Sequence, residues 1–213
     1  MQRPTIVAIG GFTSEVGKTT LMCDLLRAFP GWEAIKTTRG HYRSCGKEPD
    51  TCCVSHLLRN EPVIRLGREE TYAPGKDTGR YWDAGASKVH WVIVTDEQVE
   101  RGIKSALARV SAPGVFVEGN SFTEFVDVDF MLMVARAGGG KIKSTARRAL
   151  SKASAVCLSD LKNNGSAVAR ESFARWRSGS FADKLVGKLP VYTRDDLPQL
   201  IAQVQRIHLG LAA

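Results

Sequence analysis

A glycine-rich segment at residues 10–20 constrains the fold more than any other part of the sequence. It reads Gly-Gly-Phe-Thr-Ser-Glu-Val-Gly-Lys-Thr-Thr, follows the apolar run at 5–9 and precedes a helical pattern at 21–29. A buried strand that ends in such a turn directs backbone N–H groups and a helix N-terminus at one point, where an anion binds. The segment therefore predicts a strand–loop–helix unit that holds phosphate.

The side chains of this segment indicate how a triphosphate would be held. In glycine-rich loops of this type a lysine reaches the β- and γ-phosphates and the next hydroxyl group binds Mg²⁺, roles that we assign to Lys18 and Thr19. The nucleotide-binding residues expected from the loop are Gly11, Ser14, Glu15, Val16, Gly17, Lys18, Thr19 and Thr20. Phe12 stands where the common G-x-x-x-x-G-K-[ST] pattern begins, so the loop is one residue longer. The lengthened form, G-x-x-x-x-x-G-K-T, resembles dethiobiotin synthetase and its relatives.

The order of apolar runs predicts an α/β fold. Seven apolar, β-branched runs recur, at residues 6–9, 34–37, 89–95, 115–118, 130–135, 155–159 and 189–193. Runs that are apolar throughout, without alternation, suit strands buried on both faces. Helical patterns fall between most of them, at residues 18–29, 79–87, 97–110, 144–153, 167–178 and 197–208. We expect a doubly wound, mostly parallel sheet of about seven strands. The long connection at 38–72 should contain a short helix at 51–59.

The length and charge of the chain limit its class. At 213 residues it can bury one substantial core, and we expect a single nucleotide-binding domain over residues 1–213. No apolar run approaches the roughly 18 residues that span a membrane, and the first residues lack a signal-peptide core, so we expect a cytoplasmic protein without a membrane partner. The net charge of +8 is dispersed. An anionic small molecule explains it at least as well as nucleic acid, for which no recognisable motif is present.

Charged side chains end two further predicted strands, at the edge where ligands bind in open α/β sheets. Lys36 ends the second strand and Glu118 the fourth. A carboxylate beside a phosphate loop provides Mg²⁺ with an anionic partner, although a strand-end glutamate can also simply face water. We expect Glu118 to help order the metal ion or the attacking water, and Lys36 to face the transferred phosphate or an anionic substrate.

The segment after the Pro-Gly turn at 74–75 combines opposite charges. Lys76, Asp77 and Arg80 lie within one helical turn, and Asp77 or Thr78 is a suitable helix cap. In its plainest interpretation this is a capped helix start. In its functional interpretation Lys76 and Arg80 contact phosphates, while Asp77 joins Thr19 and Glu118 in holding Mg²⁺. The expected catalytic set is then Lys18, Lys36, Asp77 and Glu118.

The order of these motifs resembles the molybdopterin-guanine dinucleotide biosynthesis protein B family. The resemblance rests on the glycine-rich loop, the Ile-Lys-Thr strand end, Pro-Gly-Lys-Asp-Thr with Ala-Gly-Ala, Val-Glu-Gly, and Leu-Pro-Val-Tyr before the last helix, and it covers most of residues 5–207. It implies a P-loop fold of the branch that contains dethiobiotin synthetase, binding of a nucleoside triphosphate with Mg²⁺, slow hydrolysis and dimerisation. It also implies a role in attaching a nucleotide to molybdopterin, with a protein of that pathway as partner. The residues do not separate ATP from GTP; Ser159 and Asp160 are candidates for a base contact.

Cysteines set this chain apart from that family. Cys45, Cys52, Cys53 and His56 are four soft or borderline ligands close together, enough for tetrahedral zinc. Their spacing matches no common zinc pattern, so free thiols packed as small apolar groups are the alternative. Cys23 and Cys157 fall in helix and strand patterns, which predicts core positions.

Three functions therefore remain open. The first is a Mg²⁺-dependent NTPase that assists molybdopterin-type cofactor biosynthesis. The second is a metallochaperone or nucleotide switch with a cysteine-rich metal loop. The third is an ATP-dependent ligase or kinase of the dethiobiotin synthetase kind, acting on a carboxylate or amine between the glycine-rich loop and the connection at 38–72.

Overall fold

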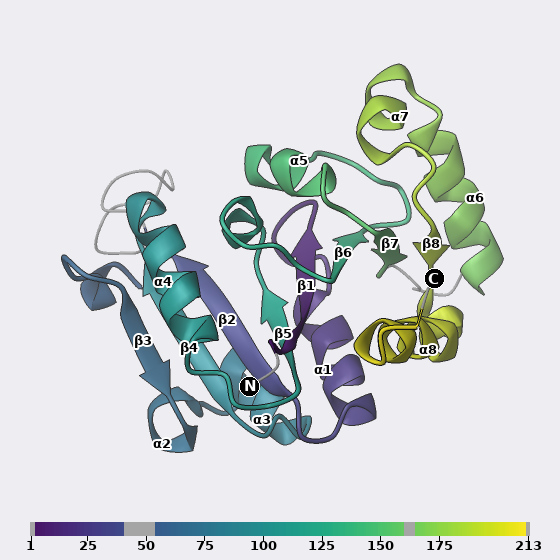
Figure 1. Cartoon of the computed structure of the whole chain (residues 1–213). Helices are drawn as coiled ribbons and strands as arrows, with labels where there is room; N and C mark the ends of the chain where they lie inside the picture. Colours follow the sequence, from purple (N-terminus) through teal and green to yellow (C-terminus); the bar gives the residue numbers. More distant parts are fainter. Residues whose placement is uncertain (1–2, 41–53, 160–164, 212–213) are drawn as a thin grey trace.

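The central feature of the structure, a computed structural model, is one eight-stranded sheet (Figure 1). The structure describes residues 3–40, 54–159 and 165–211. The strands are β1 (Thr5–Gly11), β2 (Glu33–Arg39), β3 (Val63–Leu66), β4 (Val89–Val94), β5 (Gly114–Glu118), β6 (Phe130–Ala135), β7 (Ala155–Leu158) and β8 (Val191–Tyr192). Their order is β3-β4-β2-β5-β1-β6-β7-β8, and β3 alone among them is antiparallel to its neighbour. The α/β class and the mostly parallel sheet are thus confirmed.

Helices pack on both faces of the sheet. They are α1 (Lys18–Ala28), α2 (Arg68–Thr71), α3 (Asp77–Asp83), α4 (Val99–Leu107), α5 (Ser144–Leu150), α6 (Gly165–Arg177), α7 (Ser180–Val186) and α8 (Leu197–His208). One core joins α1, α3 and α8 to the sheet, and the other joins α4, α5, α6 and α7 to the opposite face. No helix in the described ranges is long and apolar enough to cross a membrane.

Strand β1 shows why the apolar runs do not alternate with polar residues. Ile6 and Ala8 belong to one core, while Val7 and Ile9 belong to the other. Successive side chains of a strand point to opposite faces, so a strand covered on both faces needs an apolar residue at every position. The same burial pattern holds throughout β5 and β6.

The structure differs from the sequence-based expectation mainly at the periphery. Strand β3 was not predicted; its four residues are only half-buried because it is an edge strand, so its pattern is weak. Helices α2 and α7 were also missed, and both are short. The helix expected at 51–59 is reduced, within the described part, to a 3₁₀ turn at Ser55–Leu57.

The start of α3 also differs from the expectation. The helix begins at Asp77, two residues earlier than predicted, and Lys76 occupies the N-cap position without a side-chain cap hydrogen bond. Neither Asp77 nor Thr78 is therefore the cap. The Asp77 carboxylate turns instead toward side chains of α1 and β2, where the candidate site lies.

Candidate functional site

The site forms where three neighbouring strands end. Strands β2, β5 and β1 are adjacent and parallel, so their carboxyl ends lie at one edge of the sheet. From β1 comes the glycine-rich loop that leads into α1, from β2 comes Lys36, and from β5 comes Glu118. Open α/β sheets bind their ligands at such an edge.

Contacts with Asn120 and Ser159 constrain the backbone at the two ends of the glycine-rich loop. The Asn120 amide accepts a hydrogen bond from the Gly11 N–H and donates one to the Gly11 carbonyl, each 2.9 Å long. Gly17 has φ 90°, and a Cβ there would lie 3.0 Å from Ser159 Cβ, so only glycine fits comfortably. Among the described residues, no backbone N–H from 13 to 18 donates to a backbone carbonyl. These N–H groups are therefore available to an anion.

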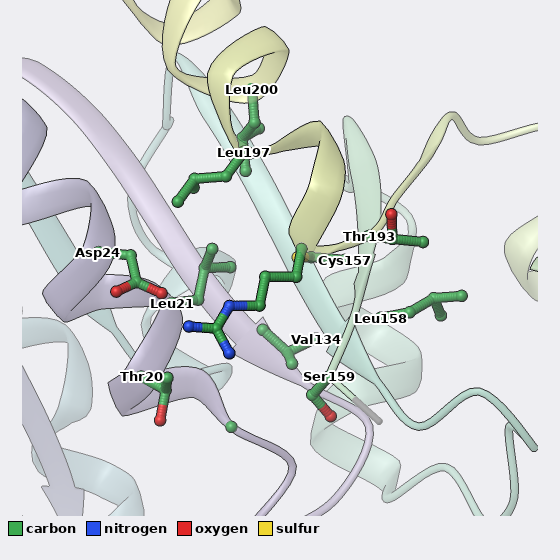
Figure 2. Close-up of a pocket in the computed structure, with 12 residues that line it drawn as sticks. Thr20, Leu21, Asp24, Val134, Cys157, Leu158, Ser159, Thr193, Leu197 and Leu200 are labelled. Carbon is green, nitrogen blue, oxygen red and sulfur yellow. The ribbon is translucent and has the colours of Figure 1, made fainter. Parts of the chain in front are cut away.

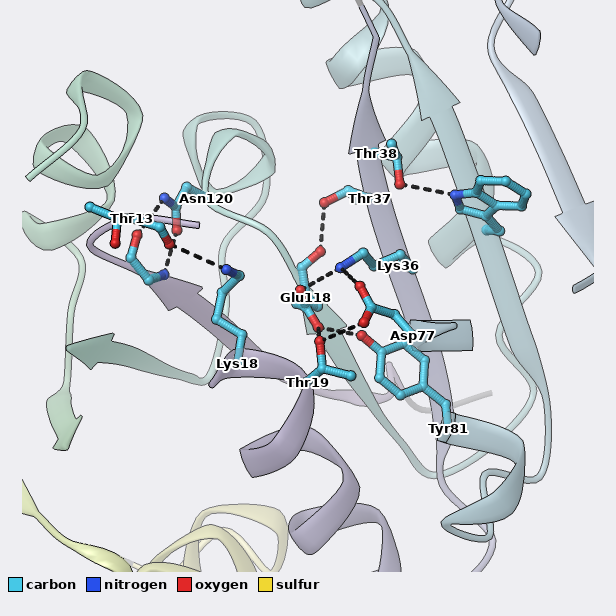
Figure 3. Close-up of polar contacts among 12 residues, drawn as sticks. Thr13, Lys18, Thr19, Lys36, Thr37, Thr38, Asp77, Tyr81, Glu118 and Asn120 are labelled. Atoms are coloured by element: carbon cyan, nitrogen blue, oxygen red, sulfur yellow. Dashed lines mark hydrogen bonds and ion pairs between the residues drawn. The ribbon is translucent and has the colours of Figure 1, made fainter. Parts of the chain in front are cut away.

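The predicted metal-binding residues converge beside this loop (Figure 3). The Thr19 hydroxyl lies 3.0 Å from Asp77 Oδ1 and 3.0 Å from Glu118 Oε2. Lys36 Nζ donates to the same two carboxylates, at 2.6 Å to Asp77 and 2.5 Å to Glu118. Residues from α1, α3, β2 and β5 thus form one cluster, which we call the Thr19–Glu118 cluster: Thr19, Lys36, Asp77 and Glu118.

Residues that the sequence analysis missed hold Glu118 in place. The fully buried Tyr81 donates a hydrogen bond from its hydroxyl to the Glu118 carboxylate, and the Thr37 hydroxyl donates to the Glu118 carbonyl at 2.6 Å. Gly119 follows with φ 152°, and a Cβ there would lie 1.9 Å from Thr37 Oγ1. Tyr81 lies four residues after Asp77, so both lie on one face of α3. That spacing was the available signal for Tyr81.

The electrostatics of the cluster follow from burial and pairing. Burial lowers the pKa of Lys18 below its ordinary value, and Glu118 only partly offsets this effect. Burial also opposes the charge on Lys36, but the carboxylates of Glu118 and Asp77 outweigh it and raise the Lys36 pKa. Burial would raise the pKa of Asp77, yet Lys36 and the Thr19 hydroxyl lower it. Burial and Glu118 raise the pKa of Tyr81 well above its usual range, so Tyr81 stays a neutral donor.

The donor set of the cluster fits a hard cation. It offers a hydroxyl oxygen and two carboxylates, the oxygen ligands that Mg²⁺ prefers, and the Lys36 ammonium lies between the carboxylates. No group of three or more His, Cys, Asp or Glu side chains suited to a metal ion occurs in the described ranges. A Mg²⁺ ion here would therefore depend on Thr19 and on phosphate oxygens or water for further ligands.

The other residues predicted to bind the nucleotide lie in different environments. Arg80 donates to the Thr20 hydroxyl at 3.2 Å, which places it against the start of α1. Ser14 accepts a hydrogen bond from Lys143, Glu15 is exposed with φ 56°, and Val16 is buried in the core. Lys76 is exposed, and no side-chain partner for it is present in the described part of the chain.

A pocket of about 160 Å³ opens beside the end of the loop (Figure 2). Its walls combine apolar side chains of α1, β6, β7 and α8 with a few polar groups: Gly17, Thr20, Leu21, Asp24, Val134, Cys157, Leu158, Ser159, Thr193, Arg194, Leu197 and Leu200. Ser159, a predicted base contact, is thus a lining residue, whereas Asp160 lies outside the described residues. Pockets with mostly apolar walls and a few polar groups suit a planar heterocycle.

The cysteine loop stays a prediction. Cys45, Cys52 and Cys53 lie outside the described residues, and His56 is exposed. Cys23 and Cys157 are buried, as expected, at 3% and 7% exposure. Burial raises the pKa of both thiols, that of Cys157 to about 12.

Comparisons with known proteins find distant structural similarity. No protein-family model matches the chain, and no curated protein matches it either. The chain is similar to the solved structure of LpxK from Aquifex aeolicus in complex with ATP, with 13% identity, coverage of 90% of this chain and 54% of that chain, and a TM-score of 0.49. It is also similar to the signal recognition particle receptor FtsY from Elizabethkingia anophelis, with 14% identity, coverage of 89% and 57%, and a TM-score of 0.42. The chain thus spans just over half the length of each.

Proposed function

We propose that the chain is a P-loop protein that binds a nucleoside triphosphate with Mg²⁺ and slowly hydrolyses it or transfers its terminal phosphate. The observation that carries the proposal is the convergence of Thr19, Lys36, Asp77 and Glu118 beside a glycine-rich loop whose N–H groups are available. Phosphoryl transfer needs little covalent chemistry from the protein. It depends on positioning and on positive charge around the phosphate oxygens, which this arrangement can supply.

Each residue of the cluster has a role in this proposal. Lys18 and the loop N–H groups would hold the β- and γ-phosphates, while Thr19, Asp77 and Glu118 would hold Mg²⁺ directly or through water. The ion supplies positive charge to the phosphate oxygens. Lys36 stabilises negative charge that develops on the transferred phosphate, and Asp77, the more exposed of the two carboxylates at 42% against 2%, orients the attacking water.

The pocket at Ser159 and Leu197 is proposed to take the base. It adjoins Gly17 and Thr20 at the start of α1, so a nucleotide whose phosphates lie on the loop reaches it with its base. Asp24, Ser159 and Thr193 supply hydrogen-bonding groups, and their side chains suit either adenine or guanine. The proposal therefore covers both ATP and GTP.

Calorimetry tests this proposal. ATP and GTP, each with Mg²⁺, are titrated into the wild type, Lys18→Ala and the control Lys104→Ala, whose side chain is exposed on α4 and pairs with Glu100. We expect at least one nucleotide to bind the wild type and the control, and Lys18→Ala to weaken that binding by about 100-fold or more, since it removes a charge-assisted contact to phosphate. Absence of binding to the wild type, or equal binding to Lys18→Ala, would exclude the proposal.

The finer proposal comes from the sequence resemblance. In this proposal, the bound nucleoside triphosphate assists the attachment of a nucleotide to molybdopterin. A protein of that pathway is the partner, and two copies of the chain act as a homodimer. The motifs at Lys36, Asp77 and Glu118 that carry the resemblance are the residues that meet in the cluster, which supports it. Light scattering tests the dimer. The yield of molybdopterin dinucleotide in a coupled assay, with the wild type and with Lys18→Ala, tests the role.

A further inference from the structure

A second pocket, of about 150 Å³, is lined in part by Lys18. It shares no lining residue with the proposed base pocket and is bounded by the glycine-rich loop, the end of β2, the start of the turn after β5 and the segment before α5. Its lining includes Thr13, Lys18, Thr37, Arg39, Ser121 and Lys143. Since a water molecule needs about 10–15 Å³ of such volume, the pocket has room for several, or for one end of a small organic molecule.

The charged side chains in the lining of this pocket are all cationic. Lys18, Arg39 and Lys143 contribute three cations, and its lining, among the described residues, includes no carboxylate. Arg39 uses one guanidinium nitrogen to pair with Asp96 at 2.7 Å, and Lys143 donates to the neutral hydroxyl of Ser14 at 2.7 Å. The chain therefore leaves positive charge and N–H donors facing one concave space, which favours an anion.

A nucleoside triphosphate does not account for all of this charge. Its phosphates lie on the loop and use Lys18, and its base occupies the pocket at Ser159. Successive side chains of β2 point to opposite faces of the sheet, which separates the cluster from the second pocket. Lys36 points into the Thr19–Glu118 cluster, whereas Thr37 and Arg39, on the opposite face of the strand, line the second pocket. Arg39 and Lys143 thus remain for another ligand.

We propose that this pocket binds the anionic group, phosphate or carboxylate, of a second small molecule, which binds together with the nucleotide and next to its terminal phosphate. The inference rests on the proposed function and adds the class of the second ligand. Arg39 and Lys143 hold the anionic group through their charged N–H donors. A protein that only hydrolyses nucleotide has no need of such a site.

The test uses the intact chain saturated with Mg²⁺ and the non-hydrolysable analogue of whichever nucleotide binds, so that the terminal-phosphate position is filled. Inorganic phosphate and malonate are titrated separately, and binding is followed by shifts of backbone amide signals in NMR spectra. We expect one anion to bind saturably, and Arg39→Ala and Lys143→Ala each to weaken it about tenfold. The control Lys104→Ala should bind as the wild type does. The tighter of the two probes identifies the anionic group.

The outcomes separate the two proposals. If the analogue binds but neither anion does, or if both variants bind the anion as tightly as the wild type, the second pocket is not a ligand site and the proposed function stands. If the analogue itself does not bind, both proposals fall. Arg39→Ala should keep nucleotide affinity within about twofold, because Arg39 pairs with Asp96, outside the cluster and the loop. A larger loss in this variant would assign Arg39 to the nucleotide and overturn the inference.

Discussion

The Lys36 ammonium group bridges two carboxylates that come from different elements, Asp77 on α3 and Glu118 on β5. Glu118 is 2% exposed and would be costly to bury as an unpaired charge. In the absence of a metal ion, Lys36 supplies the compensating charge. The same two carboxylates are the proposed ligands of Mg²⁺, so ion binding and the lysine interact with the same oxygens.

Replacing Lys36 should therefore make stability depend on Mg²⁺. Lys36→Met keeps side-chain length but leaves Asp77 and Glu118 without their cation, and we expect the free energy of unfolding to fall by about 3 kcal/mol in metal-free buffer. Millimolar Mg²⁺ should raise the thermal midpoint of the variant more than that of the wild type, because the ion now binds without displacing an ammonium group. Thermal unfolding with and without Mg²⁺ measures both effects.

A matched control distinguishes the loss of the cluster's lysine from the loss of a lysine at the surface. Lys104→Met removes an ammonium group that is 58% exposed and pairs with Glu100, and the free energy of unfolding should change by less than about 1 kcal/mol. Equal destabilisation of the two variants, or no difference in their response to Mg²⁺, would contradict the role assigned to Lys36.

At the scale of elements, a buried polar residue, Glu33, joins the start of β2 to the neighbouring strands. At its start, the buried Glu33 carboxylate accepts hydrogen bonds from the backbone N–H groups of Ser111 and Ala112, which precede β5, and pairs with His90 of β4 at 2.6 Å. Burial would raise the pKa of Glu33, but the hydrogen bonds from His90 and Ser111 outweigh it and lower the pKa to about 2. These contacts of Glu33 join β2 to both of its neighbours in the sheet, β4 and β5, and two of these three strands, β2 and β5, carry site residues.

The lowered pKa of Glu33 predicts a pH dependence of stability. A carboxyl group whose folded pKa lies below its ordinary value of 4.5 stabilises the fold above that value, and this contribution is lost as the pH falls toward 2. Wild type should therefore exceed Glu33→Gln in unfolding free energy by about 3 kcal/mol at pH 7, and the difference should shrink between about pH 5 and pH 2.

Denaturant unfolding across this pH range measures the difference, with Glu61→Gln as control. Glu61 pairs with Arg101 at the surface with 72% of its side chain exposed, so its replacement should have little effect at any pH. A difference between wild type and Glu33→Gln that does not change with pH would show that Glu33 contributes through packing and not through its charge.

How much the sequence revealed depended on burial. Strand β6, apolar at all six positions and buried at all of them, was predicted with its observed bounds. The half-buried edge strand β3 left no pattern strong enough to find. Lys36, Asp77 and Glu118 were predicted as site residues because each belongs to a recognisable motif, and the structure brings the three side chains together. Tyr81 and Asn120 were missed because their roles depend on contacts across 37 and 109 residues, which only the fold brings together.

At the scale of the whole molecule, the edge of the sheet carries three adjacent regions. The pocket at Ser159 and Leu197 lies where β6 and β7 end, and the glycine-rich loop follows β1. The Thr19–Glu118 cluster and the pocket at Arg39 and Lys143 both lie where β2 and β5 end, on opposite faces of the sheet. Lys18 lines the second of these pockets. The proposed sites for a base, a triphosphate and a further anion thus lie along one edge of the sheet.

The most direct test of the central claim is a crystal structure of the chain with Mg²⁺ and a non-hydrolysable triphosphate. We predict the β- and γ-phosphates on the backbone N–H groups of residues 13–18 with Lys18 against them, Mg²⁺ at Thr19 near Asp77 and Glu118, and the base in the pocket lined by Ser159 and Leu197. A nucleotide bound elsewhere on the chain, or a Mg²⁺ ion with no ligand or bridging water from Thr19, Asp77 or Glu118, would contradict the account.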